Sequence, residues 1–164
     1  MRTFSFFRLT VICSVLVAPL LSTPTAWGQE QNGLQGWEAD SAYNHYYNAK
    51  ELDRLKGTIS KFVEVTPLPG MARGTAFYLD EAGGEEILVH LCPTAYAEPD
   101  KTGLRRGVET KIRGSWAYIN DQDVFLAAKV KQGEHFEFKV RLTSDGTPFW
   151  SMSAEQIAKE QSDN

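Results

Sequence analysis

Cysteine is almost absent from this chain of 164 residues, which contains only Cys13 and Cys92. Long hydrophobic runs are also missing, because the longest apolar stretch has about 13 residues and a membrane-spanning helix needs roughly 20. The sequence has no G-x-G-x-x-G loop, P-loop, nucleophile elbow, zinc-knuckle spacing or internal repeat. These absences argue against a disulfide-stapled domain, a retained membrane anchor and an enzyme.

The first 28 residues have the layout of a secretory signal peptide. Arg2 and Arg8 precede the apolar run, and the small residues Ala26 and Gly28 occupy the −3 and −1 positions of a cleavage site. We therefore expect residues 1–28 to be removed from a protein that is periplasmic or secreted.

Positive charge is in the minority. The chain has 17 Lys and Arg against 21 Asp and Glu, a formal charge of −4, and removal of the leader would make this charge more negative. Nucleic-acid binding depends on basic side chains that displace counterions from phosphates. We therefore predict a protein or small-molecule ligand as the partner, with no nucleic acid and no retained membrane span.

Three parts are expected after the leader. Residues 29–50 form a loosely ordered arm, in which Trp37 and several tyrosines either dock on the domain or contact a partner. Residues 51–152 form one β-rich domain. Residues 153–164 form a short helix or tail, because Ser153 and Gln156 have capping-box spacing.

The domain has the pattern of successive short strands. Phe136, Phe138 and Val140 alternate with charged residues, which is typical of a strand with one buried and one solvated face. Glycine bends and a helical or irregular link after the third strand complete the pattern. We predict a mainly β fold: a small OB-type barrel of five to six strands with a short helical link and a short C-terminal helix. An open sandwich is the alternative.

Four segments between residues 55 and 150 carry a family resemblance: a "G-x-[IV]" strand, a "VHL-x-P" strand end, a "G-V-x-x-K-[IV]-x-G" strand and a closing "R-L-x-x-x-D-G-x-P-x-W". In these segments the chain resembles exported bacterial OB-fold proteins of unassigned function, among which some magnetosome-associated periplasmic proteins are similar. The resemblance implies an exported binding barrel and lends no reaction.

The stretch "LVHLCPTAY" places His90 and Cys92 two residues apart in a predicted strand, where strict alternation would direct both side chains to one side. An imidazole and a thiolate suit copper(I) or zinc, and Met71 could complete such a site. This would make the protein a periplasmic metal or redox accessory factor. Alternatively, His90 and Cys92 are packed in the core, or Cys92 forms a disulfide-linked homodimer.

The favoured hypothesis is a soluble binding module that recognises a protein or small ligand through one barrel face. Aromatic side chains on the surface of OB barrels commonly stack on ligands. The loops "VTPLPGMARG" and "PTAYAEPDKTG" occupy the positions at which OB barrels vary their binding surface. The predicted contact residues lie in these loops and in one strand: Trp116, Tyr118, Tyr96, Met71 and Arg73.

Overall fold

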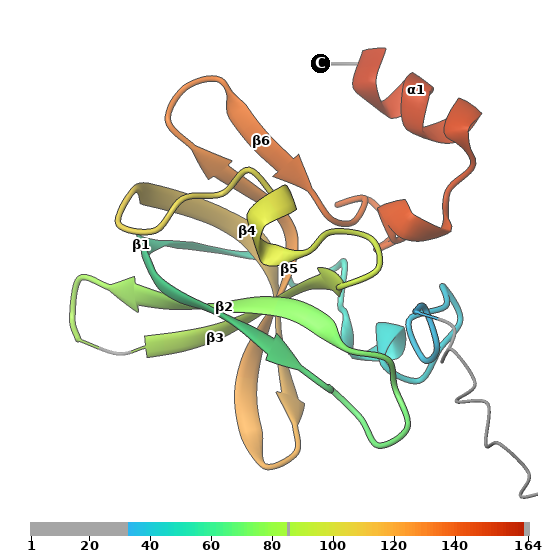
Figure 1. The fold of residues 1–164 in the computed structure, drawn as a ribbon, viewed down its shortest axis with the longest axis horizontal. Helices are drawn as coiled ribbons and strands as arrows, with labels where there is room; N and C mark the ends of the chain where they lie inside the picture. The colour runs from blue at the N-terminus through green and yellow to red at the C-terminus, as the bar shows by residue number, and fades with distance from the viewer. Residues whose placement is uncertain (1–32, 85, 163–164) are drawn as a thin grey trace, which may run out of the picture.

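A computed structural model describes residues 33–84 and 86–162 (Figure 1). The predicted signal peptide lies outside these residues. Six strands and one α-helix follow one another, with three short 3-10 helices, the first of which precedes the first strand. In chain order the elements are η1 (Asn44–Tyr46), β1 (Asp53–Val65), β2 (Gly74–Glu81), β3 (Glu86–Pro93), η2 (Pro99–Lys101), β4 (Glu109–Ile119), β5 (Gln122–Gln132), β6 (Phe136–Lys139), η3 (Phe149–Ser151) and α1 (Ala154–Ser162).

The strands form one sheet in the order β3-β2-β1-β4-β5-β6. All neighbours in this order are antiparallel, and β3 also pairs with β5 in parallel through only Val89↔Phe125 and His90↔Leu126. This short pairing partly closes strands β1 to β5 into a barrel. Strand β6 pairs with β5 and lies outside this closed part. The prediction of a mainly β, OB-type barrel is confirmed, including the short helical link η2 and the C-terminal helix.

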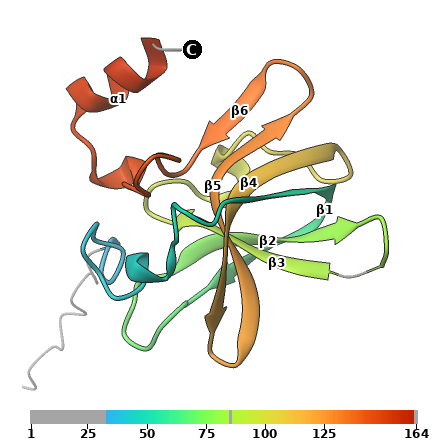
Figure 2. The same ribbon diagram turned by 180° about the vertical axis from the view of Figure 1, so that it is seen from behind.

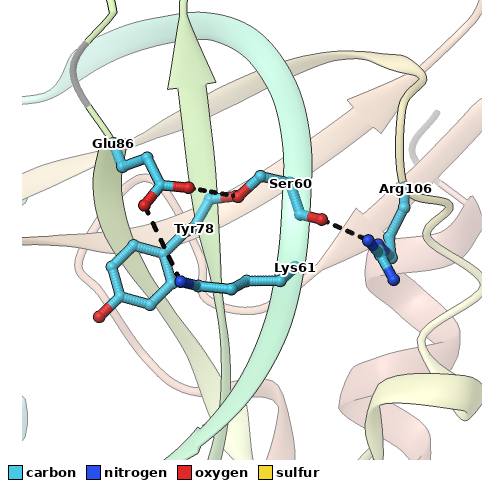
Figure 3. Close-up of polar contacts among 5 residues, drawn as sticks. All are labelled: Ser60, Lys61, Tyr78, Glu86 and Arg106. Carbon is cyan, nitrogen blue, oxygen red and sulfur yellow. Dashed lines mark hydrogen bonds and ion pairs between the residues drawn. The ribbon is translucent and has the colours of Figure 1, made fainter.

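Strand β1 is long and bent because it serves both halves of the barrel. Its beginning pairs with β4 and its end with β2, and the register with β2 shifts at Ser60. Figure 3 shows how this irregular point is held: Ser60 Oγ donates to Glu86 at 2.9 Å, and Arg106 Nε donates to the Ser60 carbonyl at 2.8 Å. Lys61 lies over the Tyr78 ring, 4.4 Å from its centroid. β1, β2, β3 and the link before β4 are thereby joined.

Gly114 allows β4 and β5 to approach closely. A Cβ at this position would lie 2.1 Å from the Leu126 carbonyl oxygen, far inside van der Waals contact. The register between β4 and β5 shifts next to it, between Arg113 and Gly114. The curvature of the barrel here therefore requires glycine.

We expect Gly114→Ala to lower the free energy of unfolding by about 1–3 kcal/mol, because the strand backbones must separate to admit the methyl group. Urea denaturation measures this change. Gly83→Ala is the control, since nothing lies within 4 Å of a Cβ built there. Equal stability of the two variants would contradict the close approach.

The described residues form two hydrophobic clusters. The first fills the barrel and includes Ile59, Phe77, Leu91 and Phe125. The second lies outside the barrel, between the outer side chains of β2, β3 and β5 and the segment before β1. Figure 2 shows this segment, in blue, against one end of the sheet.

The C-terminal helix begins as its sequence predicts. The Gln156 backbone N–H donates to Ser153 Oγ at 3.2 Å, and the Ser153 N–H donates to the Gln156 side chain at 2.8 Å. This reciprocal pair is a capping box. Within residues 33–84 and 86–162, no helix is long and apolar enough to cross a membrane.

Candidate functional site

The arm before β1 covers the outer surface of β2, β3 and β5. Trp37, Tyr43 and Tyr47 are buried there, against residues such as Ala76 and Leu126. The arm therefore docks its aromatic side chains on the domain, which is the first of the two alternatives that the sequence left open. OB barrels commonly bind ligands on the face of their second and third strands, and here the chain itself occupies much of that face.

Trp37 is the centre of this contact. Its indole N–H donates to the Ala72 carbonyl at 2.8 Å, and its own carbonyl accepts from Trp150 Nε1 at 2.7 Å. A Cβ on Gly74 would lie 2.3 Å from the indole ring, so the ring packs directly on the backbone of β2. The arm, the β1–β2 loop and the C-terminal segment are thus joined at Trp37.

Arg141 is buried beside the arm without a carboxylate partner among the described residues. Its guanidinium lies 4.9 Å from the Trp150 ring centroid and 5.5 Å from that of Tyr47, and it donates to Asn44 Oδ1. Cation–π contacts and this hydrogen bond take the place of an ion pair. Burial lowers the pKa of Arg141 and raises that of Tyr43.

His90 lies at the edge of the same cluster. Its Nδ1 is 3.1 Å from the Tyr43 hydroxyl. Burial, reinforced by the charge of Arg141, lowers the pKa of His90 to about 4. The imidazole is therefore neutral near pH 7, which suits it to accept a hydrogen bond from the Tyr43 hydroxyl.

Cys92 departs from the strict alternation that the sequence suggests. Thr75 pairs with Cys92 and Ala76 with His90, so Leu91 is an additional residue in β3. This bulge places Cys92 in the barrel cluster together with Leu91, whereas the His90 ring lies against the arm.

Burial raises the pKa of the Cys92 thiol to about 12, so the thiolate that would bind a soft metal is disfavoured. Met71 is buried beside Gly36 of the arm. No group of three His, Cys, Asp or Glu among the described residues could hold a metal. Cys92 is free and fully buried, so an interchain disulfide would require the barrel to open. The copper or zinc site and the linked dimer stay predictions.

The structure separates the five predicted contact residues. Met71 is buried under the arm, and Arg73 is exposed in an ion pair with Glu64 at 2.7 Å. Tyr96 lies beside Trp150, with ring centroids 5.9 Å apart. Trp116 and Tyr118 alone share one face of a strand, in the part of β4 that continues beyond the barrel.

A shallow depression of about 570 Å³ adjoins Trp116, between β3 and the β4–β5 hairpin. We call it the Trp116 depression. Its lining residues are Glu86, Ile87, Trp116 and Asp123. Tyr118 is paired with Asp123 at its rim.

The Trp116 ring is exposed but fixed. Its exposed fraction is 42%, yet its Nε1–H donates to Asp53 Oδ2 at 3.2 Å and its ring packs edge-on against Phe125, with centroids 5.2 Å apart. An ordered ring loses little conformational freedom when a ligand stacks on it. The carboxylates of Asp53 and Asp123 make the surroundings acidic, while that of Glu86 is shared with Lys61 at 3.9 Å.

Ile87, Glu86 and Asp123 were not among the predicted contact residues. Asp123 could have been found, because Asn120 and Asp121 form a two-residue turn with positive φ at both positions, which places Asp123 opposite Tyr118. The approach of β3 depends on closure of the barrel and has no local signal in the sequence.

Strand order, partial closure and the short link define a small OB-type barrel, here with a docked amino-terminal arm and one open aromatic depression. The chain belongs to the MamS/MamX magnetosome protein family, which matches residues 51–137. This match extends from just before β1 into β6 and agrees with the resemblance to magnetosome-associated proteins. No curated protein and no solved structure matches the chain.

Proposed function

We propose that the protein is a non-catalytic, exported binding module that recognises a protein or small ligand at the Trp116 depression. The observation that carries the proposal is the fixed, exposed indole of Trp116 in a hollow of the surface. The leader-like pattern of residues 1–28 supports a periplasmic or secreted location.

The lining indicates the chemistry of the ligand. The Trp116 face and the Ile87 side chain offer apolar contact, and the carboxylates of Glu86 and Asp123 flank them. A cation placed over an indole gains cation–π attraction, and nearby carboxylates add charge attraction. A ligand that carries an apolar group next to a positive charge fits this combination.

The neighbouring surfaces are less suited to this role. The outer face of β2, β3 and β5 is covered by Trp37, Tyr43 and Tyr47. Tyr96 is engaged with Trp150 and Phe138. The Trp116 depression therefore offers the best combination of exposure and order among the predicted contact residues.

Calorimetric titration with a synthetic octapeptide of alternating Lys and Leu tests the proposal. We expect Trp116→Ala to weaken binding of this peptide by about tenfold, the effect of one aromatic anchor. Tyr46→Ala is the matched control, because Tyr46 is an aromatic residue of the arm that is 41% exposed. This variant should bind the peptide with an affinity within about twofold of that of the unmodified protein.

Thermal unfolding of both variants shows whether each is folded. An equal loss in Trp116→Ala and Tyr46→Ala would contradict the proposal, as would the failure of the unmodified protein to bind the peptide saturably.

A further inference from the structure

A second surface, on the outside of β1, β4, β5 and β6, concentrates positive charge. The strand register aligns its side chains in two rows that run across the sheet. The first row is Arg54, Arg113, Lys129 and Lys139, and the second is Lys56, Lys111, Lys131 and Glu137. Seven of the 17 Lys and Arg of the chain thus share one face of an acidic protein.

This arrangement works against stability. Arg54 lies directly opposite Arg113, and Arg113 directly opposite Lys129. Like charges directly opposite each other on neighbouring strands are destabilising. A chain with more acidic than basic residues could carry neutral or acidic side chains at these positions. Because it carries a cluster of like charges that costs stability, we read the two rows as a binding surface.

Both rows are partly neutralised at their lysines, since Lys129 of the first row lies 3.7 Å from Glu137, but the two arginines of the first row are not. Glu109 lies 3.1 Å from Lys56, and Glu137 lies 2.8 Å from Lys131. Among the described residues, no carboxylate is within ion-pair distance of Arg54 or Arg113. Two guanidinium groups therefore stand side by side with their forked donors available.

The face is also hollowed. A groove of about 420 Å³ is lined by the six basic residues of β1, β4 and β5 and by two aliphatic residues of the strands between the rows. The lining residues are Arg54, Leu55, Lys56, Lys111, Ile112, Arg113, Lys129 and Lys131. Lys and Arg stems supply apolar walls while their charged ends remain in water.

We propose that this basic groove binds an extended acidic segment of a partner protein. Arginine forks match carboxylates in bidentate geometry. Neighbouring residues of one row are about 4.8 Å apart, and the two rows are about 6.7 Å apart along the strands. In an extended peptide, carboxylates on the same side recur about every 6.7 Å. Two acidic residues separated by one residue can therefore each contact one of the two rows.

The shape of the face favours a peptide over other polyanions. A bilayer surface is a plane and meets protruding charges best, whereas six of these cations line a recess. Nucleic acid is disfavoured because its phosphates would be repelled by a chain whose formal charge is −4. The basic groove is separate from the Trp116 depression, so either proposal can fail without the other.

The test is a titration of the full chain with an octapeptide of alternating Glu and Ser, beside a Gln and Ser peptide of the same length. Arg54→Gln with Arg113→Gln should weaken binding of the Glu peptide by about tenfold or more, because charge-assisted hydrogen bonds are lost. Lys50→Gln with Lys101→Gln is the control with the same change in charge on exposed positions elsewhere, and it should leave the affinity within about twofold.

A second readout separates binding from folding. The arginine double variant should unfold at a temperature equal to or higher than that of the unmodified protein, since a like-charge contact has been removed. Equal loss of binding in both double variants, or no preference for the Glu peptide over the Gln peptide, would overturn the proposal. Binding of phosphatidylglycerol vesicles or of a single-stranded oligonucleotide in place of the Glu peptide would overturn it as well.

Discussion

Trp37→Ala is expected to lower the free energy of unfolding by about 3–5 kcal/mol, the range for loss of a large buried aromatic side chain. The indole packs on the backbone of β2 and against Tyr43 and Trp150, with ring centroids 4.7 and 5.7 Å away. Its removal leaves a cavity and also leaves the Ala72 carbonyl without its donor. The whole arm should therefore loosen.

Urea denaturation gives the change in stability, and hydrogen exchange of residues 33–52 reports on the arm. Trp37→Phe keeps much of the ring volume but loses the hydrogen bond to Ala72, so an intermediate loss is expected. Tyr46→Ala in the same arm is the control, because its side chain is exposed. A loss below about 1 kcal/mol in Trp37→Ala would show that the arm does not stabilise the domain.

The second large effect is a loss of stability in acid caused by His90. Burial lowers the pKa of His90 from 6.5 to about 4. Well above pH 6.5 the imidazole is neutral in both the folded and the unfolded chain, so it has no effect there. As the pH falls from 6.5 to about 4, the unfolded chain binds a proton that the folded protein does not. His90 therefore costs stability in this window, by about 3 kcal/mol at its lower end.

Unfolding free energies of the unmodified protein and His90→Gln, measured from pH 7.5 to 4, isolate this contribution. Glutamine retains a hydrogen-bonding partner for the Tyr43 hydroxyl but does not titrate. The unmodified protein should lose more stability than the variant across the interval. Parallel curves would show that His90 is protonated as readily in the folded protein as in the unfolded chain.

Much of the fold follows from local patterns. Val124, Leu126 and Ala128 share one buried face of β5, as their spacing predicts, and Ser153 forms the predicted cap of α1. Val130, expected on the same face, lies in the barrel cluster instead, because the register between β4 and β5 shifts before it. The buried face and the cap both depend on residues close in sequence. Such patterns therefore sufficed for the class of fold and for several of its elements.

Other features depend on contacts between distant segments. The additional residue Leu91 in β3 turns the Cys92 side chain to the barrel side of the sheet, and nothing in "VHLCP" signals this bulge. The two rows of cations arise only when the registers of β1, β4 and β5 are combined. From the sequence, each strand showed only an ordinary solvated face.

The candidate site was predictable in part. Trp116 and Tyr118 share one face of their strand, as alternation requires, and their exposure agrees with a contact role. Their neighbours Glu86 and Ile87 come from another hairpin and are brought near by closure of the barrel. Met71 looked accessible in a loop, but the arm covers it.

The most direct test of the proposed binding function is an NMR titration of the indole N–H resonance of Trp116 with the Lys and Leu octapeptide. This proton lies in a hydrogen bond to Asp53 at the edge of the depression, whereas the Trp37 indole N–H is buried under the arm. Binding at the Trp116 depression predicts a saturable shift of the Trp116 signal with an unchanged Trp37 signal. A saturable shift of the Trp37 signal with the Trp116 signal unmoved, or saturable binding that moves neither signal, would contradict it.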